Sequence, residues 1–192
     1  MATIAAFDFD GTLTRRDCMV PFLCRVAGSG AVVRALAAES PAMARHGRDG
    51  VKARVLKRLL AGRSLADVTS RGELFAGDII DRRLRSDTVA ILRRHQDAGD
   101  RTVLVSASLR PYLEPVATAL GIDHVICTEL EVVDGALTGE IIGGNCRGPV
   151  KAARLQAWLG DPSADDGVLW AYGDSSGDDE LLALATHGVR IR

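Results

Sequence analysis

The chain has 192 residues, of which 47% are hydrophobic and 26% are charged, and its formal net charge is −1. This length suits one domain with a modest insertion and supplies enough apolar side chains for a core. The near-zero net charge and the 4% of aromatic residues exclude the basic, aromatic-rich surface that is typical of nucleic-acid-binding proteins. We therefore expect no nucleic-acid partner.

The sequence shows no sign of export or of a membrane anchor. No apolar run approaches the roughly 18 residues of a membrane span, and the N-terminus lacks the basic region of a signal peptide. The four cysteines form no C-x-x-C pair and no zinc-finger spacing, which is typical of reduced thiols inside a cell. They are Cys18, Cys24, Cys127 and Cys146. We expect a cytoplasmic protein without a membrane span.

Strand-like and helix-like patterns alternate along most of the chain. Short apolar runs predict buried parallel strands at 3–9, 102–106, 124–128 and 168–172, and a short edge strand at 188–191. Helical patterns lie between them at 88–98, 112–120, 150–159 and 178–185. This alternation predicts an α/β fold with a Rossmann-like parallel sheet and right-handed crossovers.

Two segments interrupt the alternation. Apolar runs at 130–133 and 136–142 flank Asp134-Gly135, which predicts a β-hairpin with a type I′ turn. Residues 15–85 contain no strand-like run and are too long for an ordinary loop. Their pattern predicts several helices separated by glycine and proline, which form a cap inserted into the α/β domain.

We therefore expect an α/β core from residues 1–14 and 86–192, with the hairpin at about 130–142, and a helical cap from residues 15–85.

The predicted cap is basic. Between Arg15 and Arg63 it holds eleven bases and three acids, a net charge of +8 in a chain of net charge −1. Such a lobe favours anionic ligands by steering, and a solvated arginine-rich helix surface explains the bias equally well.

The sequence Asp8-Phe9-Asp10-Gly11-Thr12 directly follows the first predicted strand. Because side chains in a strand alternate, both carboxylates point to one side, at the carboxyl end where open α/β sheets bind ligands. Gly11 allows the backbone to turn and brings N–H groups close to an anion. An acidic loop with a turn glycine is the plainer alternative.

A second acidic group follows the predicted strand at 168–172. Its sequence is Gly173-Asp174-Ser175-Ser176-Gly177-Asp178. Carboxylates from two strands, completed by water, form an octahedral oxygen site suited to Mg²⁺. Taken alone this pattern is weak, because Asp and Ser often cap helices.

Two further polar residues complete the pattern. Ser106 ends the strand at 102–106, where its hydroxyl and the turn N–H groups can hold a phosphate oxygen. Lys151 opens a predicted helix and is one of three lysines in the chain. A lysine within a carboxylate cluster relieves the repulsion between the acids. Alone, Ser106 is explained by capping and Lys151 by exposure at the surface.

Taken in chain order, with Ser106 second, Lys151 third and the Gly173 to Asp178 segment last, the four motifs resemble those of the haloacid dehalogenase-like superfamily of phosphatases, from Ile4 to about Leu182. The insertion after the first motif is similar to a C1-type cap, and the hairpin resembles the phosphoserine-phosphatase-like branch, subfamily IB. The resemblance implies a phosphomonoester hydrolase that acts on a small phosphate ester with Mg²⁺ as cofactor.

The resemblance also implies roles for individual residues. Asp8 would attack phosphorus and form an aspartyl-phosphate, and Asp10 would protonate the leaving group and then activate water. Asp8, Asp10 through its backbone carbonyl, Asp174 and Asp178 would form the metal site. Ser106, Lys151 and the N–H groups after Asp8, at Gly11 and Thr12, would stabilise the transferring phosphoryl group.

Substrate recognition is implied by the same resemblance. In phosphoserine phosphatases an acid after the first motif binds the substrate amine, and Asp17 occupies that position. A cap arginine binds the carboxylate, and Arg54 matches it. Alternatively, Asp17 caps a helix and Arg54 points to solvent. The substrate cradle departs from the usual glycines at Ala107 and Ser108.

These departures leave the substrate open. Phosphoserine is one candidate, and phosphomonoesters of phospholipid type are another. A phosphotransferase that passes the aspartyl-phosphate to an alcohol is a further alternative. A non-catalytic binding module would have to keep a costly cluster of carboxylates without a metal.

Overall fold

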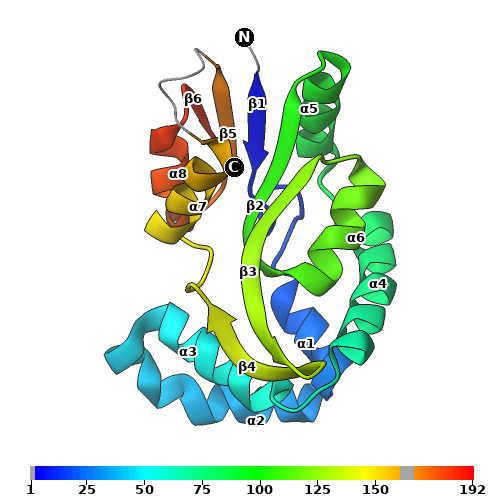
Figure 1. The fold of residues 1–192 in the computed structure, drawn as a ribbon, viewed down its shortest axis with the longest axis vertical. Coiled ribbons are helices and arrows are strands. Elements are labelled where there is room, and N and C mark those ends of the chain that lie inside the picture. The colour runs from blue at the N-terminus through cyan, green and yellow to red at the C-terminus, as the bar shows by residue number, and fades with distance from the viewer. Residues whose placement is uncertain (1–2, 161–166) are drawn as a thin grey trace.

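The computed structural model describes residues 3–160 and 167–192. Its centre is a six-stranded sheet in the order β4-β3-β2-β1-β5-β6, in which β4 runs antiparallel to its neighbour and the other pairs are parallel (Figure 1). The strands are β1 (Ile4–Phe7), β2 (Arg101–Leu109), β3 (His124–Val133), β4 (Ala136–Ile142), β5 (Leu169–Gly173) and β6 (His187–Arg190). The predicted α/β class with a parallel core is confirmed.

Helices cover both faces of the sheet (Figure 1). They are α5 (Ser86–Asp97) and α6 (Arg110–Leu120) on one side, and α7 (Pro149–Leu159) and α8 (Asp179–Leu184) on the other. Because neighbouring strand residues face opposite ways, Phe7 packs in the cluster that contains Leu113 of α6. Ala6 packs in the cluster that contains Leu155 of α7.

The hairpin forms where the Asp-Gly pair predicts it. Asp134 and Gly135 have φ angles of 49° and 77°, as a type I′ turn requires. The expected separate strands at 124–128 and 130–133 are instead one strand, β3, with a register irregularity between Leu130 and Val132. The irregularity lets one strand serve both the parallel sheet and the hairpin, because a bulge bends a strand without ending it.

The inserted segment is helical, as predicted. It contains α1 (Met19–Ala27), α2 (Ser29–Glu39), a 3₁₀ turn (Ser40–Ala42), α3 (Met43–Leu60) and α4 (Leu65–Arg82). The helix α3 is kinked at Gly47, whose φ of 62° is not helical. Figure 1 shows these helices below the carboxyl ends of the parallel strands, with α4 running back along α6.

The hairpin packs against the cap. In the loop between α3 and α4, the Gly62 N–H donates to the Leu137 carbonyl at 2.8 Å, and the Leu137 N–H donates to the Arg63 carbonyl at 2.8 Å. A Cβ at Gly139 would lie 2.6 Å from the Lys57 Cα, so β4 and α3 approach closely. The hairpin that we expected in the core therefore shares a surface with the cap.

Among the described residues, no single helix is long and apolar enough to cross a membrane. Only when α1 and α2 are taken together, across a bend of 119°, do described helices reach the length and apolar composition of a span.

Candidate active site

The first acidic motif lies where β1 ends. The Asp8 N–H donates to the Tyr172 carbonyl at 2.9 Å, which continues the pairing of β1 with β5 for one more residue. The Asp8 side chain is buried, and its Oδ1 accepts a hydrogen bond from the Lys151 Nζ at 2.6 Å. The motif thus places a carboxylate at the carboxyl end of the central strand, beside a buried cation.

Lys151 joins the two acidic motifs. Its Nζ also lies 2.5 Å from Asp178 Oδ1, and the lysine is 2% exposed. Burial alone would lower the pKa of Lys151, but the carboxylates of Asp8 and Asp178 raise it above its ordinary value. Burial would likewise raise the pKa of Asp178, and Lys151 brings it below its ordinary value. The lysine is therefore a fixed positive charge at the base of the site.

Asp8, Asp174 and Asp178 converge. Each offers a carboxylate oxygen, and these atoms lie within 4.8 Å of one another. Asp174 Oδ1 is buried, and it has no hydrogen-bond partner among the residues that the structure describes. A buried carboxylate oxygen without a donor is costly, and a bound cation would satisfy it. The oxygen-only donor set fits a hard divalent cation such as Mg²⁺.

The second acidic motif is held rigid by its own turn. Ser175 opens the 3₁₀ turn Ser176–Asp178, and its hydroxyl accepts a hydrogen bond from the Gly177 N–H at 3.2 Å. In return, Asp178 Oδ2 accepts from the Ser175 N–H at 3.0 Å. The capping interpretation of this motif is therefore correct for Ser175. The same motif also brings Asp174 close to Asp8, so it both caps the turn and contributes to the acid cluster.

Asp10 lines the same cavity as this acid cluster, but its side chain is held by other partners. Its Oδ1 accepts from the Cys18 N–H at 2.8 Å, and its Oδ2 is bonded to the Ser108 hydroxyl. Burial, together with the nearby charge of Asp17, raises the pKa of Asp10 to about 7. Such a carboxyl can both give and take a proton near neutral pH.

The remaining predicted phosphate ligands divide into two groups. Gly11, Ser106, Ala107 and Lys151 line the same cavity as Asp8, which has a volume of about 440 Å³. The Thr12 side chain does not line that cavity, because it is fully buried beneath the loop. The Ser106 hydroxyl accepts from the Ser108 N–H at 3.0 Å, so its own proton is free to face the cavity.

The two predicted cap residues behave differently. Asp17 lines the cavity, and its Oδ1 also accepts from the Val20 N–H at 3.1 Å at the start of α1. The structure does not bring Arg54 to the site, because its guanidinium pairs with the buried Glu39 of α2. The expectation that Arg54 lies at the substrate site is therefore wrong. The alternative, that Arg54 points to solvent, agrees better with its side chain, which is 56% exposed.

Lys52 occupies the place that we expected for Arg54. Residues two apart on a helix differ by about 200° in direction, so Lys52 points into the cavity while Arg54 points at α2. The Lys52 Nζ donates to the Ala107 carbonyl and to Asn145 Oδ1. Burial lowers the pKa of Lys52 to about 8. The scarcity of lysine was the one signal in the sequence that could have singled it out.

Asn145 completes a connection between cap and core that sequence reasoning missed. It follows the hairpin, and its side-chain amide donates to Asp49 Oδ1 of α3 at 2.7 Å. Its Oδ1 also accepts from the Thr128 hydroxyl at 2.9 Å. Arg15, Arg16, Arg48 and Arg147 line the mouth of the same cavity. The cavity therefore has an acidic floor and a largely basic rim.

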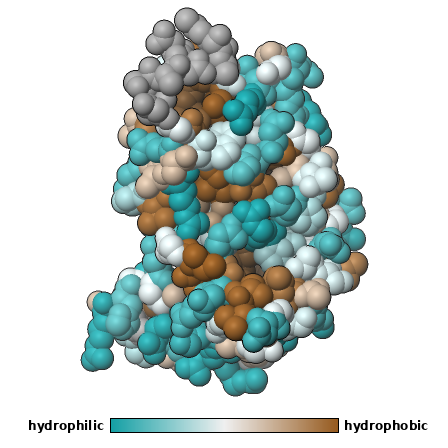
Figure 2. Space-filling model, viewed as in Figure 1, coloured by the Kyte–Doolittle hydropathy of each residue, from teal (hydrophilic) through white to brown (hydrophobic). Residues whose placement is uncertain are grey.

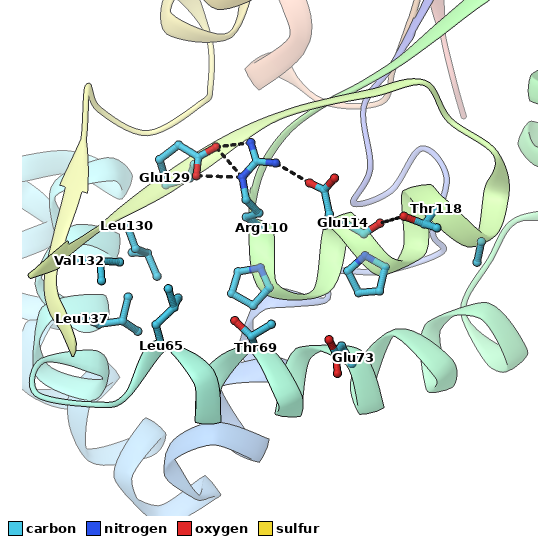
Figure 3. A pocket seen from close by; sticks show the side chains of 14 residues that line it. Leu65, Thr69, Glu73, Arg110, Glu114, Thr118, Glu129, Leu130, Val132 and Leu137 are labelled. Atoms are coloured by element: carbon cyan, nitrogen blue, oxygen red, sulfur yellow. Dashed lines mark hydrogen bonds and ion pairs between the residues drawn. The ribbon is translucent and has the colours of Figure 1, made fainter. Parts of the chain in front are cut away.

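A second, larger cavity of about 710 Å³ lies between α4, α6 and the hairpin. Figure 3 shows Leu65, Leu130, Val132 and Leu137 gathered at one end. On its upper wall the Arg110 guanidinium is bonded to Glu129 and Glu114 (Figure 3). On the face of the molecule in Figure 2, brown hydrophobic surface gathers in the lower half, between teal hydrophilic areas. The acids that converge on Asp8 do not line this cavity.

The acid cluster at the carboxyl end of a parallel sheet, under a helical cap, matches the arrangement that the resemblance of the motifs implies. The sequence profile of the haloacid dehalogenase-like hydrolases matches residues 5–183. The chain therefore belongs to this family.

Two relatives extend over nearly the whole chain. Protein CicA of Caulobacter vibrioides (strain NA1000 / CB15N) is 37% identical over 193 residues, which cover 98% of this chain and 86% of CicA. Phosphoserine phosphatase SerB2 of Mycobacterium tuberculosis is 29% identical over 187 residues, which cover 97% of this chain and 43% of SerB2.

Solved structures share the fold. A protein of unknown function from Bordetella pertussis Tohama I is 30% identical, with a TM-score of 0.79 and coverage of 97% of this chain and 88% of that one. A substrate-bound phosphoserine phosphatase is 20% identical, with a TM-score of 0.64 and coverage of 99% and 85%, and shows the fold alone. Family and relatives together make the chain a phosphatase that is similar to the phosphoserine phosphatases.

Proposed function

We propose that this chain is a Mg²⁺-dependent phosphomonoester hydrolase that forms an aspartyl-phosphate on Asp8 and acts on a small anionic phosphometabolite in the cytoplasm. The convergence of Asp8, Asp174 and Asp178 around a buried lysine carries the proposal. Burial raises the pKa of Asp8 to about 6, and the charge of Lys151 opposes that rise. At neutral pH the carboxylate is therefore mostly ionised and can act as a nucleophile. The four free cysteines are consistent with a reducing compartment.

The reaction would proceed in two displacements. An Asp8 oxygen attacks phosphorus, the bond between phosphorus and the leaving oxygen breaks, and Asp10 gives that oxygen its proton. A water molecule then attacks the same phosphorus, Asp10 takes the water proton, and the Asp8 carboxylate is released with inorganic phosphate. Ser106 and Lys151 hold the phosphoryl oxygens in both steps, because both residues line the cavity that contains Asp8.

The metal would be held by Asp8, Asp174 and Asp178 and by the backbone carbonyl of Asp10. The buried Asp174 Oδ1, to which no residue in the described ranges donates, supports this assignment. When bound, Mg²⁺ supplies positive charge that draws electron density from the phosphoryl group and offsets the repulsion between acids. Lys151 supplies the same compensation from the protein side.

The mouth of the cavity supports an anionic leaving group. Lys52 lies close to the Ala107 turn, and Asp17 lies near Asp10 on the cap side. An amino-acid phosphate such as phosphoserine would place its carboxylate on Lys52 and its amine on Asp17. Phosphotransfer to an alcohol acceptor uses the same intermediate, and product analysis with an added acceptor separates it from hydrolysis.

An ester with an apolar leaving group is the second candidate, and one observation favours it. A smaller groove of about 150 Å³ between α1, α2 and α3 shares Met19, Arg48 and Lys52 with the catalytic cavity. Its other lining residues are apolar. A phospholipid-type phosphomonoester has the anionic head and apolar body that such an arrangement accommodates.

The mechanism is tested by replacing the nucleophile. We expect Asp8→Asn to lower kcat on an aryl phosphate ester by several orders of magnitude, because the amide cannot form the acyl phosphate. We also expect chelation of Mg²⁺ to abolish turnover by the wild type. Asp179→Asn is the matched control, because Asp179 pairs with Arg190 outside the cavity and should keep near-normal activity. Near-normal turnover by Asp8→Asn would contradict the proposal.

The substrate class is tested by comparing two cap cations. If Lys52 binds an anion of the leaving group, Lys52→Ala should lower kcat/KM for that substrate roughly 10- to 100-fold, the range for a lost charged hydrogen bond. It should change turnover of a small neutral-tailed ester far less. Arg54→Ala, two residues along α3, should leave both substrates unaffected. Equal losses on both substrates would show that Lys52 serves the cap and not recognition.

A further inference from the structure

The Asp10 carboxyl is fixed at both of its oxygens. The Cys18 N–H donates to Oδ1 at 2.8 Å, and the Ser108 hydroxyl is bonded to Oδ2. Ser108 is itself fixed, because the Tyr112 hydroxyl donates to its Oγ at 2.6 Å. Ser108 and Tyr112 are both at most 2% exposed. A chain of two buried hydroxyls therefore leads to the carboxyl that we assign as the proton donor.

The Tyr112 ring is immobilised by rings from three other segments. Its centroid lies 4.8 Å from that of Phe22 in α1, 5.6 Å from that of Phe75 in α4 and 6.4 Å from that of Phe9 beside Asp10. A tyrosine has only two side-chain torsions, so this packing leaves its hydroxyl one position. The anchor of the chain thus depends on both the core and the cap.

The local sequence explains why the chain forms here. Ser106 and Ser108 are two residues apart at the end of β2, and the Ser108 N–H donates to the Ser106 hydroxyl at 3.0 Å. The next element, α6, begins at Arg110 and places Tyr112 in its first turn. One short segment therefore contributes a phosphate-facing hydroxyl and a hydroxyl that faces Asp10.

We propose that Ser108 and Tyr112 are positioning residues that hold the Asp10 carboxyl in the orientation for proton transfer to the leaving oxygen. The inference rests on the proposed function, in which Asp10 is the acid. Neither hydroxyl needs to touch the substrate, because each acts through Asp10. Proton transfer requires the donor within hydrogen-bond reach of its target, and a small displacement of a catalytic group lowers the rate strongly.

The test is the dependence of rate on the leaving group. The value of kcat/KM reports the steps up to departure of the leaving group, so it isolates the first proton transfer from hydrolysis of the aspartyl-phosphate. A series of aryl phosphates with phenols of increasing pKa serves as the probe, with Mg²⁺ present throughout. A good leaving group departs without a proton, whereas a poor one needs Asp10.

We expect Ser108→Ala to steepen the fall of kcat/KM with leaving-group pKa. The loss of kcat/KM should reach about tenfold for the poorest leaving group. This is less than the roughly 10²- to 10⁴-fold that a general acid contributes, because Asp10 itself is still present. It should be small for the best leaving group. Tyr112→Phe keeps the packed ring and should produce a smaller change in the same direction. Ser108→Thr, which retains the hydroxyl, should restore the wild-type slope.

A matched control lies on the same strand. Thr102→Val removes a buried hydroxyl that donates to Asp123 Oδ2 at the other end of β2, and should lower Tm without changing the slope. A wild-type slope in both Ser108→Ala and Tyr112→Phe would overturn the inference, and Tyr112→Phe decides alone if Ser108→Ala does not fold. A wild-type slope in Asp10→Asn would instead overturn the assignment of Asp10, and with it the proposed function at that residue.

Discussion

Gly11 shows how one residue position serves the whole site. Its φ of 89° lies in the region that favours glycine, and a Cβ there would overlap the Asp174 carboxylate. The backbone of the loop after β1 therefore lies directly against the carboxylate of Asp174, which belongs to the turn after β5. The absence of a side chain at this position is what allows the acids of the two motifs to converge.

We expect Gly11→Ala to displace Asp174 and raise the Mg²⁺ concentration needed for half-maximal activity. Gly62→Ala separates this effect from backbone strain, because Gly62 also has a positive φ of 77° but open space around it. Both variants should lose about 1–3 kcal/mol of stability from the strained backbone. Magnesium titrations of activity and thermal unfolding measure the two effects. An unchanged magnesium dependence in Gly11→Ala would contradict this role.

The residues that sequence analysis found and those that it missed differ in one physical respect. Asp8 and Asp174 directly follow buried strands and Ser106 lies near the end of another, and the parallel sheet brings strand ends to one edge. The positions of Lys52 and Asn145 depend on how the cap packs on the core, which no local pattern encodes. The family resemblance points to Arg54, but the helical period turns Arg54 towards Glu39 and Lys52 towards the cavity.

At the scale of elements, the crossing of α4 on α6 fixes the cap against the core. Gly72 of α4 lies directly over Pro111, so that a Cβ there would overlap the Pro111 carbonyl oxygen. Two helices can approach this closely only where one of them lacks a side chain. Phe75, one turn further along α4, packs on Tyr112 of α6 at a ring distance of 5.6 Å. The crossing therefore positions the ring that anchors Ser108.

We expect Gly72→Ala to destabilise the protein by about 1–3 kcal/mol, the usual cost of overpacking, because α4 must move away from α6. Gly77→Ala, on the same helix, should stabilise it by about 0.5–1 kcal/mol, because nothing lies near that position and alanine is the better helix former. Urea unfolding of the two variants measures the contrast. A Gly72→Ala variant as stable as the wild type would show that the helices do not touch there.

Elements were predictable where their signal is local. The hairpin turn follows from Asp134-Gly135, because few residues accept its positive φ angles. The surface against which the hairpin packs was not predictable, since the contact of Gly139 with Lys57 joins segments far apart in sequence. The fusion of two expected strands into β3 also escaped prediction, because bulges carry no clear sequence signal.

At the scale of the whole molecule, cap and core share one hydrophobic cluster. Buried residues of the sheet and of α6 belong to it, such as Phe7 and Leu113, and so do cap residues such as Phe22, Leu56 and Phe75. Separate domains would each have a core of their own. The cap that is inserted after β1 therefore packs against the α/β core without a core of its own that is separate from this cluster.

This continuity predicts a single unfolding transition. Both tryptophans of the sequence, Trp158 and Trp170, lie in the α/β core, so their fluorescence reports the core, whereas circular dichroism of helices also reports the cap. We expect the two signals to give the same urea midpoint, as two-state unfolding requires. Leu56→Ala, which removes a fully buried cap side chain, should cost about 2–5 kcal/mol and move both midpoints together. If the variant shifted the dichroism midpoint and left the fluorescence midpoint in place, the cap would unfold alone, and the shared cluster would not couple it to the core.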